Sequence, residues 1–183
     1  MPRPKTRPRL NVKRHQVTQP LDKPYRFIPL TRKQSAIVDV EDFEWLSRWN
    51  WYAQWAPTTH SFYAVRKENY GKVRIHRIIL DCGPDKEVDH RNHDTLDNRR
   101  ENLRKCTRLQ NGRNQRTPRD NTSGFKGVSW DKQVGKWRVM ISIDRHQKSI
   151  GYFRSRENAA RAYDKVAKKH HGEFAHLNFH SNY

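Results

Sequence analysis

Short runs of β-branched and aromatic residues alternate with turn residues from Ile28 to Leu80. Runs of this length, bounded by Pro, Asn, Asp and Ser, are typical of strands. The pattern therefore predicts a small mixed sheet, with strands over residues 35–40, 49–55, 61–67 and 73–80. Between the first two runs, residues 42–48 are expected to form one or two helical turns.

Four acidic residues gather where this short helix is expected to begin: Asp39, Glu41, Asp42 and Glu44. Carboxylates near a helix N-terminus are favoured by the helix dipole, which explains the cluster without any chemistry. A metal site is the alternative that the sequence leaves open.

The last third of the chain has a clearer period. Every other residue from 137 to 143 is apolar, which is the pattern of a half-buried strand. Ser155 is a suitable N-cap and Gly172 a suitable end for a helix with one apolar stripe. Together with strand-like runs at 125–130, 136–144 and 147–153, this predicts a three-stranded sheet packed on one helix and, for the whole chain, an α+β fold.

The chain is strongly basic: 38 Lys and Arg against 19 Asp and Glu give a formal net charge of +19. A net charge of this size indicates which partners the chain binds rather than which fold it adopts, and it favours nucleic acid as the partner. A membrane partner is not expected, because the longest uninterrupted apolar run is only the four residues 62–65. The two cysteines fit free thiols in a reducing cytoplasm.

The positive charge is concentrated in two segments. Residues 1–26 form a basic, Pro-rich arm, expected to be extended and either to follow DNA or simply to aid solubility. Residues 86–119 are rich in Asn and Arg and either face phosphate or form a linker. The turn residues that follow place a linker at 117–122, between a domain at 27–116 and a second at 123–183.

One set of residues points to chemistry. Val88-Asp89-His90 is followed by Asn102-Leu103, twelve residues after His90, and by Asn111, nine residues later. Over residues 76–116, approximately, this arrangement resembles the HNH nuclease family, in particular its homing-endonuclease branch. The resemblance implies a ββα-metal motif, in which a strand ends in Asp-His, an Asn closes a loop, and a helix carries the last His or Asn.

Phosphodiester hydrolysis requires an activated water and a cation that neutralises charge on the phosphate. Asp89 and Asn111 offer hard oxygen ligands for Mg²⁺ or Mn²⁺, although Asn114, one turn later, could replace Asn111. An imidazole can deprotonate water near neutral pH, and the resemblance assigns this role to His90. Asn102 is expected to bridge the loop behind it.

Several basic residues are expected to contact DNA near this motif. In the pair His76-Arg77, which also resembles phage HNH proteins, Arg77 could hold the scissile phosphate, while His76 is either a site residue or a packing residue. Further phosphate contacts are expected from Arg99, Arg100, Arg113 and Arg116, a solvated surface being the alternative.

The end of the chain resembles a second family. Phe125-Lys126-Gly127-Val128, Gly151-Tyr152-Phe153 and Leu177-Asn178-Phe179 come in the order of the plant ethylene-response-factor (Apetala-type) DNA-binding domain, over residues 123–179. This resemblance implies a three-stranded antiparallel sheet that enters the major groove of double-stranded DNA. By position, the residues that would read DNA are Lys126, Ser129, Arg138, Ser142, Gln147 and Ser149.

The sequence thus predicts a homing-type DNA endonuclease that uses a single Mg²⁺ or Mn²⁺ ion, acts in the cytoplasm of a bacterial host, and nicks as a monomer. Deleting residues 120–183 is expected to leave a working nuclease with relaxed site choice. The main alternative is a DNA-binding regulator whose nuclease motif has decayed, and a less favoured one is an RNA-processing nuclease.

Overall fold

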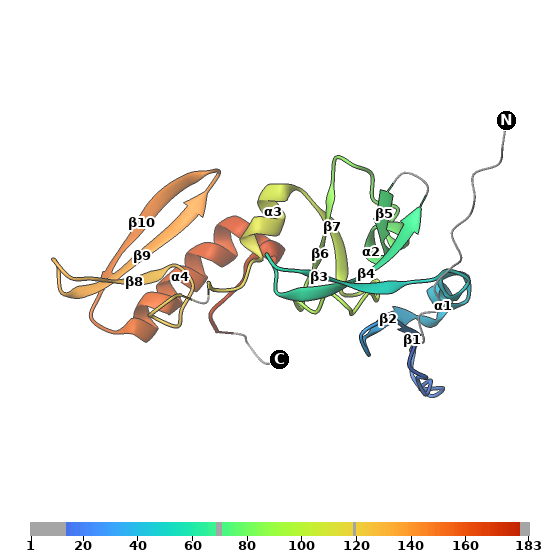
Figure 1. The fold of residues 1–183 in the computed structure, drawn as a ribbon. Helices are drawn as coiled ribbons and strands as arrows, with labels where there is room; N and C mark the ends of the chain where they lie inside the picture. Colours follow the sequence, from blue (N-terminus) through green and yellow to red (C-terminus); the bar gives the residue numbers. More distant parts are fainter. Residues whose placement is uncertain (1–13, 69–70, 119, 180–183) are drawn as a thin grey trace. The chain divides into compact units, whose positions relative to one another are not determined.

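The computed structural model describes residues 14–68, 71–118 and 120–179, so half of the expected basic arm, residues 1–13, lies outside it. The chain forms two compact units (Figure 1). The first runs to Pro84 and includes His90–Lys105, and the second takes Asp85–Asp89 and the chain from Cys106 onward. The division between these units falls within the expected nuclease motif. None of the described helices is both long and apolar enough to cross a membrane.

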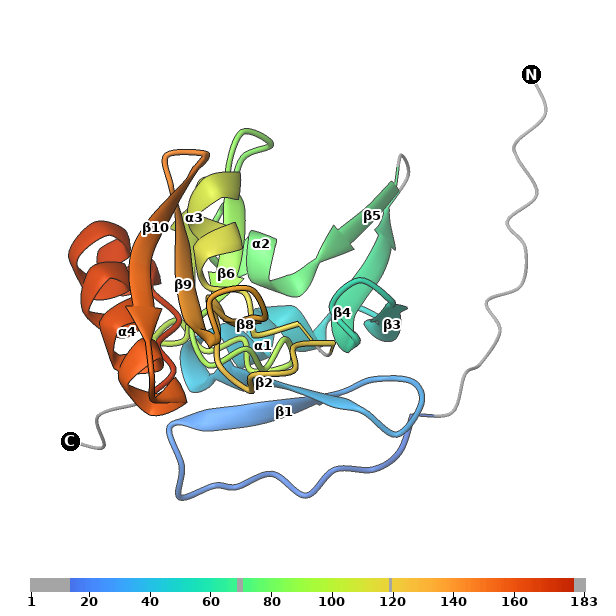
Figure 2. The ribbon, with the colours of Figure 1, turned by 90° about the vertical axis from the view of Figure 1, so that its left-hand side faces the viewer.

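The first unit opens with a two-stranded antiparallel sheet. β1 (Tyr25–Pro29) pairs with β2 (Ser35–Asp39), and α1 (Val40–Ser47) follows directly (Figure 2). Trp51 is fully buried after this helix, and its indole N–H donates to the carbonyl of Leu46 at 2.8 Å. This buried aromatic anchors the end of α1 in the core of the unit.

A second sheet has the strand order β3-β4-β5, all antiparallel: β3 (Tyr52–Ala56), β4 (Ser61–Glu68) and β5 (Gly71–Arg74). The strand predicted over 73–80 is wrong beyond Arg74, because α2 (Ile75–Ile79) occupies that segment. Its buried residues include the pair Ile75 and Ile79, four positions apart, a spacing that places both on one face of a helix.

Part of the basic arm is held by the first unit. Arg14 donates from its guanidinium to the carbonyl of Trp51 at 3.0 and 3.1 Å. Farther along, the amide of Gln19 exchanges two hydrogen bonds with the backbone of Phe27, at 2.8 and 2.9 Å. The described part of the arm is therefore bonded to the first unit at Arg14 and Gln19.

The elements of the expected nuclease motif follow in the predicted order of strand, strand and helix: β6 (Glu87–His90), β7 (Leu103–Cys106) and α3 (Arg108–Arg113). α3 begins at a capping box. The hydroxyl of Thr107 accepts from the backbone of Gln110 at 3.2 Å, and the Gln110 side chain accepts from the backbone of Thr107 at 2.8 Å.

The second unit has the predicted three-stranded antiparallel sheet with one helix. The strand order is β10-β9-β8, formed by β8 (Val128–Asp131), β9 (Lys136–Ile143) and β10 (His146–Phe153). α4 (Arg156–His171) lies along one face of this sheet, and the short η1 (Gly172–Phe174) follows it (Figure 2).

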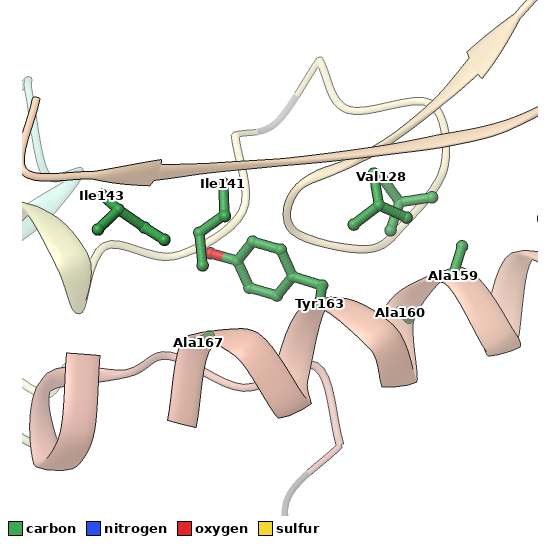
Figure 3. Close-up of a cluster of buried hydrophobic side chains, with 8 residues drawn as sticks. Val128, Ile141, Ile143, Ala159, Ala160, Tyr163 and Ala167 are labelled. Carbon is green, nitrogen blue, oxygen red and sulfur yellow. The ribbon is translucent and has the colours of Figure 1, made fainter. Parts of the chain in front are cut away.

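The core of this unit lies between β9 and α4, where Ile141 and Ile143 face Tyr163 and Ala167 (Figure 3). Gly127 is required beside it. Its φ is +75°, and a Cβ built there would lie 2.2 Å from the ring of Tyr163. Only glycine permits this approach of the chain to the core.

Candidate functional site

His90, the last residue of β6, is buried in a cluster of aromatic rings within the first unit. Its ring centroid lies 5.0 Å from that of His76 and 6.3 Å from that of Tyr63, both in edge-to-face geometry. Burial holds the pKa of His76 well below its ordinary value of 6.5, with the charges of His90, Arg74 and Arg77 acting in the same direction. His76 is therefore a neutral packing residue next to His90.

Asn98 sets the orientation of the His90 imidazole. Asn98 is fully buried, and its amide nitrogen donates to the carbonyl of Leu96 at 2.9 Å, so its Oδ1 faces Nε2 of His90 at 3.4 Å. An amide oxygen only accepts, so Nε2 is the donor in this contact. In the sequence Asn98 stands in a polar run that signals only a turn, so this contact was missed.

The loop that follows β6 is closed by Asn102. Its Oδ1 accepts from the backbone N–H of Asn92 at 2.9 Å, and its Nδ2 donates to the carbonyl of Asp97 at 2.7 Å. A backbone hydrogen bond from Arg91 to the carbonyl of Asn102, at 2.9 Å, joins the two ends of the loop. The side chain thus fixes the backbone that leaves His90.

Arg99 and Arg100, expected to contact phosphate, hold buried carboxylates instead. Arg99 donates to both oxygens of Asp97 at 2.8 and 2.7 Å, and Arg100 donates to both oxygens of Asp42 at 2.8 Å. Asp39 accepts from the backbone N–H of Arg100 at 2.8 Å. Two carboxylates of the acidic cluster therefore anchor this loop to the start of α1.

Arg77 also makes hydrogen bonds within the protein. Its guanidinium donates to the carbonyls of Cys82 and Gly83 at 3.0 and 2.5 Å, at the turn after α2. The exposed Arg74 lies beside the aromatic cluster, with its guanidinium carbon 4.6 Å from the ring centroid of Tyr63. Arg74 is thus a candidate for a phosphate contact in the first unit, and nothing in the sequence around it pointed to this role.

The second unit brings together two acid–amide pairs on β6 and α3. Asn111 donates to a carboxylate oxygen of Glu87 at 2.6 Å. Asn114, the C-cap of α3, donates to both oxygens of Asp89 at 2.9 and 3.0 Å. Glu87 and Asp89 alternate with Val88 and so share one face of the strand. The structure thus places Asn114, rather than Asn111, against Asp89.

These pairs fit a hard divalent cation. Among the described residues no group of three His, Cys, Asp or Glu side chains forms a metal site. Asp89 and Asn114 supply one carboxylate and one amide, and rotation of the amide about its last bond would present Oδ1 in place of Nδ2. Mg²⁺ is commonly held by one or two protein oxygens, with water and phosphate oxygens completing its shell.

The sheet of the second unit presents a polar face to solvent. Arg138 and Ser142 alternate along β9 with the core residues, and Ser129 pairs with Arg138 across the sheet. Gln147 pairs with Ser142, and Ser149 of β10 is exposed beside them. Five of the six residues expected to read DNA therefore lie exposed on this sheet; we call them the polar sheet face.

Lys126, the sixth, is turned away from solvent. Its ammonium group donates to the carbonyls of Arg113 and Gln115 at 2.7 and 2.6 Å, and burial lowers its pKa to about 8. Arg113 donates to Asp144 at 3.1 Å and is largely covered, whereas Arg116 is exposed. Of these three cations, only Arg116 is exposed.

Several relatives match parts of the chain. Part of the chain is similar to the AP2-like ethylene-responsive transcription factor TOE2 of Arabidopsis thaliana, 36% identical over 67 residues, which is 37% of this chain and 14% of the relative. A longer match, 28% identical over 146 residues, covers 76% of this chain and 72% of the uncharacterized HNH endonuclease L560 of Acanthamoeba polyphaga mimivirus. No solved structure matches the chain.

The family itself follows from two further matches. A family profile described as HNH endonuclease matches residues 81–113, which hold β6, the loop closed by Asn102, and α3. Protein 3.8 of Escherichia phage T7 is 36% identical over 91 residues, which is 48% of this chain and 72% of that protein. On these grounds, the chain belongs to the HNH endonuclease family.

Proposed function

We propose that this protein is a site-specific DNA endonuclease of the homing type, which hydrolyses a phosphodiester with one divalent cation and a histidine general base. The observation that supports this most is at the end of β6. There, Asp89 and His90 are consecutive in the chain. Within the second unit Asp89 accepts from the buried amide of Asn114, and within the first unit His90 contacts the buried amide of Asn98. Two functional groups with preset orientations are what a hydrolytic site requires.

His90 takes the proton of the attacking water. The hydrogen bond between Nε2 and Asn98 orients the imidazole for this step. The packed rings of His76 and Tyr63 hold the imidazole in one plane. Asn102 acts only through the loop backbone and is a positioning residue.

Asp89 and Asn114 would hold the cation, Mg²⁺ or Mn²⁺. When bound, such an ion neutralises charge on the phosphate and on the leaving oxygen. The chain's own contribution is the pairing of one carboxylate with one amide at a capped helix end. Arg74, exposed beside the aromatic cluster, is the cation of the chain that we assign to the phosphate.

Double-stranded DNA is the proposed substrate. The polar sheet face provides hydrogen-bonding groups that can reach base edges, and Arg138 is its strongest candidate because an arginine paired with guanine contributes about 1–3 kcal/mol of discrimination. With one nuclease motif per chain, a monomer would cut one strand. A phage relative agrees with action in the cytoplasm of a bacterial host.

The test is the conversion of supercoiled plasmid to open circles, with Mg²⁺ or Mn²⁺ and with a chelator. His90→Ala is expected to lower the rate by about 10²- to 10⁴-fold, the usual contribution of a general base, and to leave DNA affinity unchanged. Sequencing the ends formed from phage or host DNA would give the target site.

A regulator without nuclease activity is the second candidate, favoured by the likeness of the second unit to plant factors named as transcription factors. It would bind a defined DNA site through the polar sheet face. In that case neither Mg²⁺ nor Mn²⁺ would support nicking, and His90→Ala would change neither DNA cleavage nor DNA affinity.

A further inference from the structure

The segment that leads into β8 is fixed against helix α4. The backbone N–H of Lys126 donates to Oδ1 of Asn178 at 2.6 Å, and Nδ2 of Asn178 donates back to the carbonyl of Lys126 at 3.2 Å. Asp164 of α4 accepts from the backbone N–H of Asn178 at 2.8 Å. Gly127 then packs on Tyr163. The sheet β8–β10 and the helix α4, which we call the C-terminal module, thus fix the backbone position from which the Lys126 side chain extends.

From this position the ammonium group of Lys126 reaches the end of α3. Its two acceptors, the carbonyls of Arg113 and Gln115, belong to the residues on either side of Asn114. The last carbonyls of a helix have no partners within the helix, and a lysine satisfies them well. Lys126 therefore holds the backbone on both sides of the amide that contacts Asp89.

A second contact reaches the same turn from the β9–β10 hairpin. Arg113 donates to Asp144 at 3.1 Å, and the Arg113 side chain is only 16% exposed. Asp144 stands in the hairpin turn, with a φ of +49°. Ser142 and Gln147 flank this turn and belong to the polar sheet face. The hairpin that carries this face is thus bonded to the residue before Asn114.

We propose that Lys126 and the Arg113–Asp144 pair make the C-terminal module a working part of the nuclease site, because they hold Asn114 against Asp89. Lys126 is then a positioning residue for cleavage and not a base-reading residue. The module that we propose to bind DNA thus also positions the C-terminal end of α3, where Asn114 would contact the metal ion. Deleting residues 120–183 should therefore abolish cleavage, in contrast to the expectation from the sequence. The proposal rests on the nuclease function proposed above.

The first experiment compares Lys126→Met with Lys148→Met, which removes an exposed lysine from β10 of the same module. Nicking is measured at saturating DNA over a range of Mg²⁺ concentrations, and DNA affinity is measured without divalent ions. We expect Lys126→Met to nick about 10- to 100-fold more slowly and to require more Mg²⁺, as for other groups that orient a ligand. Its DNA affinity should match that of Lys148→Met, and Lys126→Arg should recover part of the rate.

Two results of this experiment would overturn the proposal. In one, Lys126→Met nicks as fast as Lys148→Met. In the other, Lys126→Met loses affinity but reaches the wild-type rate at saturating DNA, which would make Lys126 a DNA contact.

A second measurement is independent of cleavage. Hydrogen exchange of the backbone amide of Asn114 is followed in the full chain without metal or DNA, with the amide of Tyr163 as a check that the module remains folded. Exchange at Asn114 should accelerate in Lys126→Met and Asp144→Asn but not in Lys148→Met, and equal rates in all three variants would refute the coupling. If exchange responds as expected while the wild type fails to nick, the proposed nuclease function fails and the coupling stands.

Discussion

At the scale of single residues, the neighbourhood of His90 explains why two histidines of one cluster have different tasks. His76 is 3% exposed, and its Nδ1 has no hydrogen-bond partner among the described residues. Protonating it would bury a charge with nothing to compensate it. His90 instead has an amide oxygen at its Nε2. The first imidazole packs as a neutral ring, whereas the second is the one that we propose as the general base.

The state of His76 predicts a dependence of stability on pH. Because burial lowers its pKa below 6.5 in the folded protein, the unfolded chain takes up more protons. Its contribution to the free energy of unfolding is complete above pH 6.5 and is lost as the pH falls toward the folded-state pKa. In denaturant titrations below pH 6.5, the free energy of unfolding of the wild type should fall as the pH is lowered. It should fall less steeply in His76→Phe. The exposed His60, changed to Gln, is the control, and an unchanged slope in His76→Phe would contradict the assignment.

A second residue-scale prediction separates the two asparagines of α3. Asn114→Ala should lower the nicking rate and raise the Mg²⁺ requirement by about 10- to 100-fold, since it removes the amide that contacts Asp89. Asn111→Ala, which loses only its contact with Glu87, should have the smaller effect. Nicking assays of both variants on one plasmid substrate test this prediction. A larger effect of Asn111→Ala would make Asn111 the metal-ligand candidate in place of Asn114.

At the scale of elements, the loop between β6 and β7 depends on tertiary anchors. Two backbone hydrogen bonds, each 2.8 Å long, join it to Ile37 of β2. The N–H of Ile37 donates to the carbonyl of Leu96, and the N–H of Asn98 donates to the carbonyl of Ile37. The pair of Arg100 with Asp42 adds a bidentate contact to α1. The loop that positions His90 is therefore built onto the first hairpin of the unit.

Loss of this anchor should destabilise the first unit without weakening DNA binding. Arg100→Met leaves the nearly buried carboxylate of Asp42 without its strongest donor and should lower the free energy of unfolding by about 1–3 kcal/mol. Arg48→Met, at an exposed pair on α1, should change it by less than about 0.5 kcal/mol. Urea titrations measure both. A drop in DNA affinity with stability unchanged would make Arg100 a phosphate contact after all.

The sequence predicted those elements whose signals are local. The alternation from 137 to 143 predicted β9, Ser155 predicted the start of α4, and the resemblance of residues 76–116 to the HNH family predicted the nuclease motif. The contacts of Arg100 with Asp42 could not be predicted, because they join residues far apart in the chain and a basic residue in a basic segment suggests DNA equally well. The choice of Asn114 over Asn111 depends on how α3 lies against β6, which the spacing alone does not give.

At the scale of the whole molecule, the net charge of +19 makes DNA binding steeply dependent on salt. The slope should reflect only those cations that solvent can reach. Arg116→Gln should reduce the slope of log affinity against log salt by about 0.9, the value for one phosphate contact. Arg113→Gln should leave it nearly unchanged, because its side chain is covered and paired with Asp144. Binding titrations over a range of salt concentrations test this, and equal effects of the two variants would place both residues on DNA.

The most direct test of the central claim is the nicking of supercoiled DNA by the full chain, with Mg²⁺ or Mn²⁺, compared between the wild type and His90→Ala. The account predicts open circles from the wild type only when a divalent ion is present, and a rate lower by about 10²- to 10⁴-fold in His90→Ala at equal DNA affinity. Cleavage by His90→Ala at the wild-type rate, or by the wild type in chelator, would contradict it.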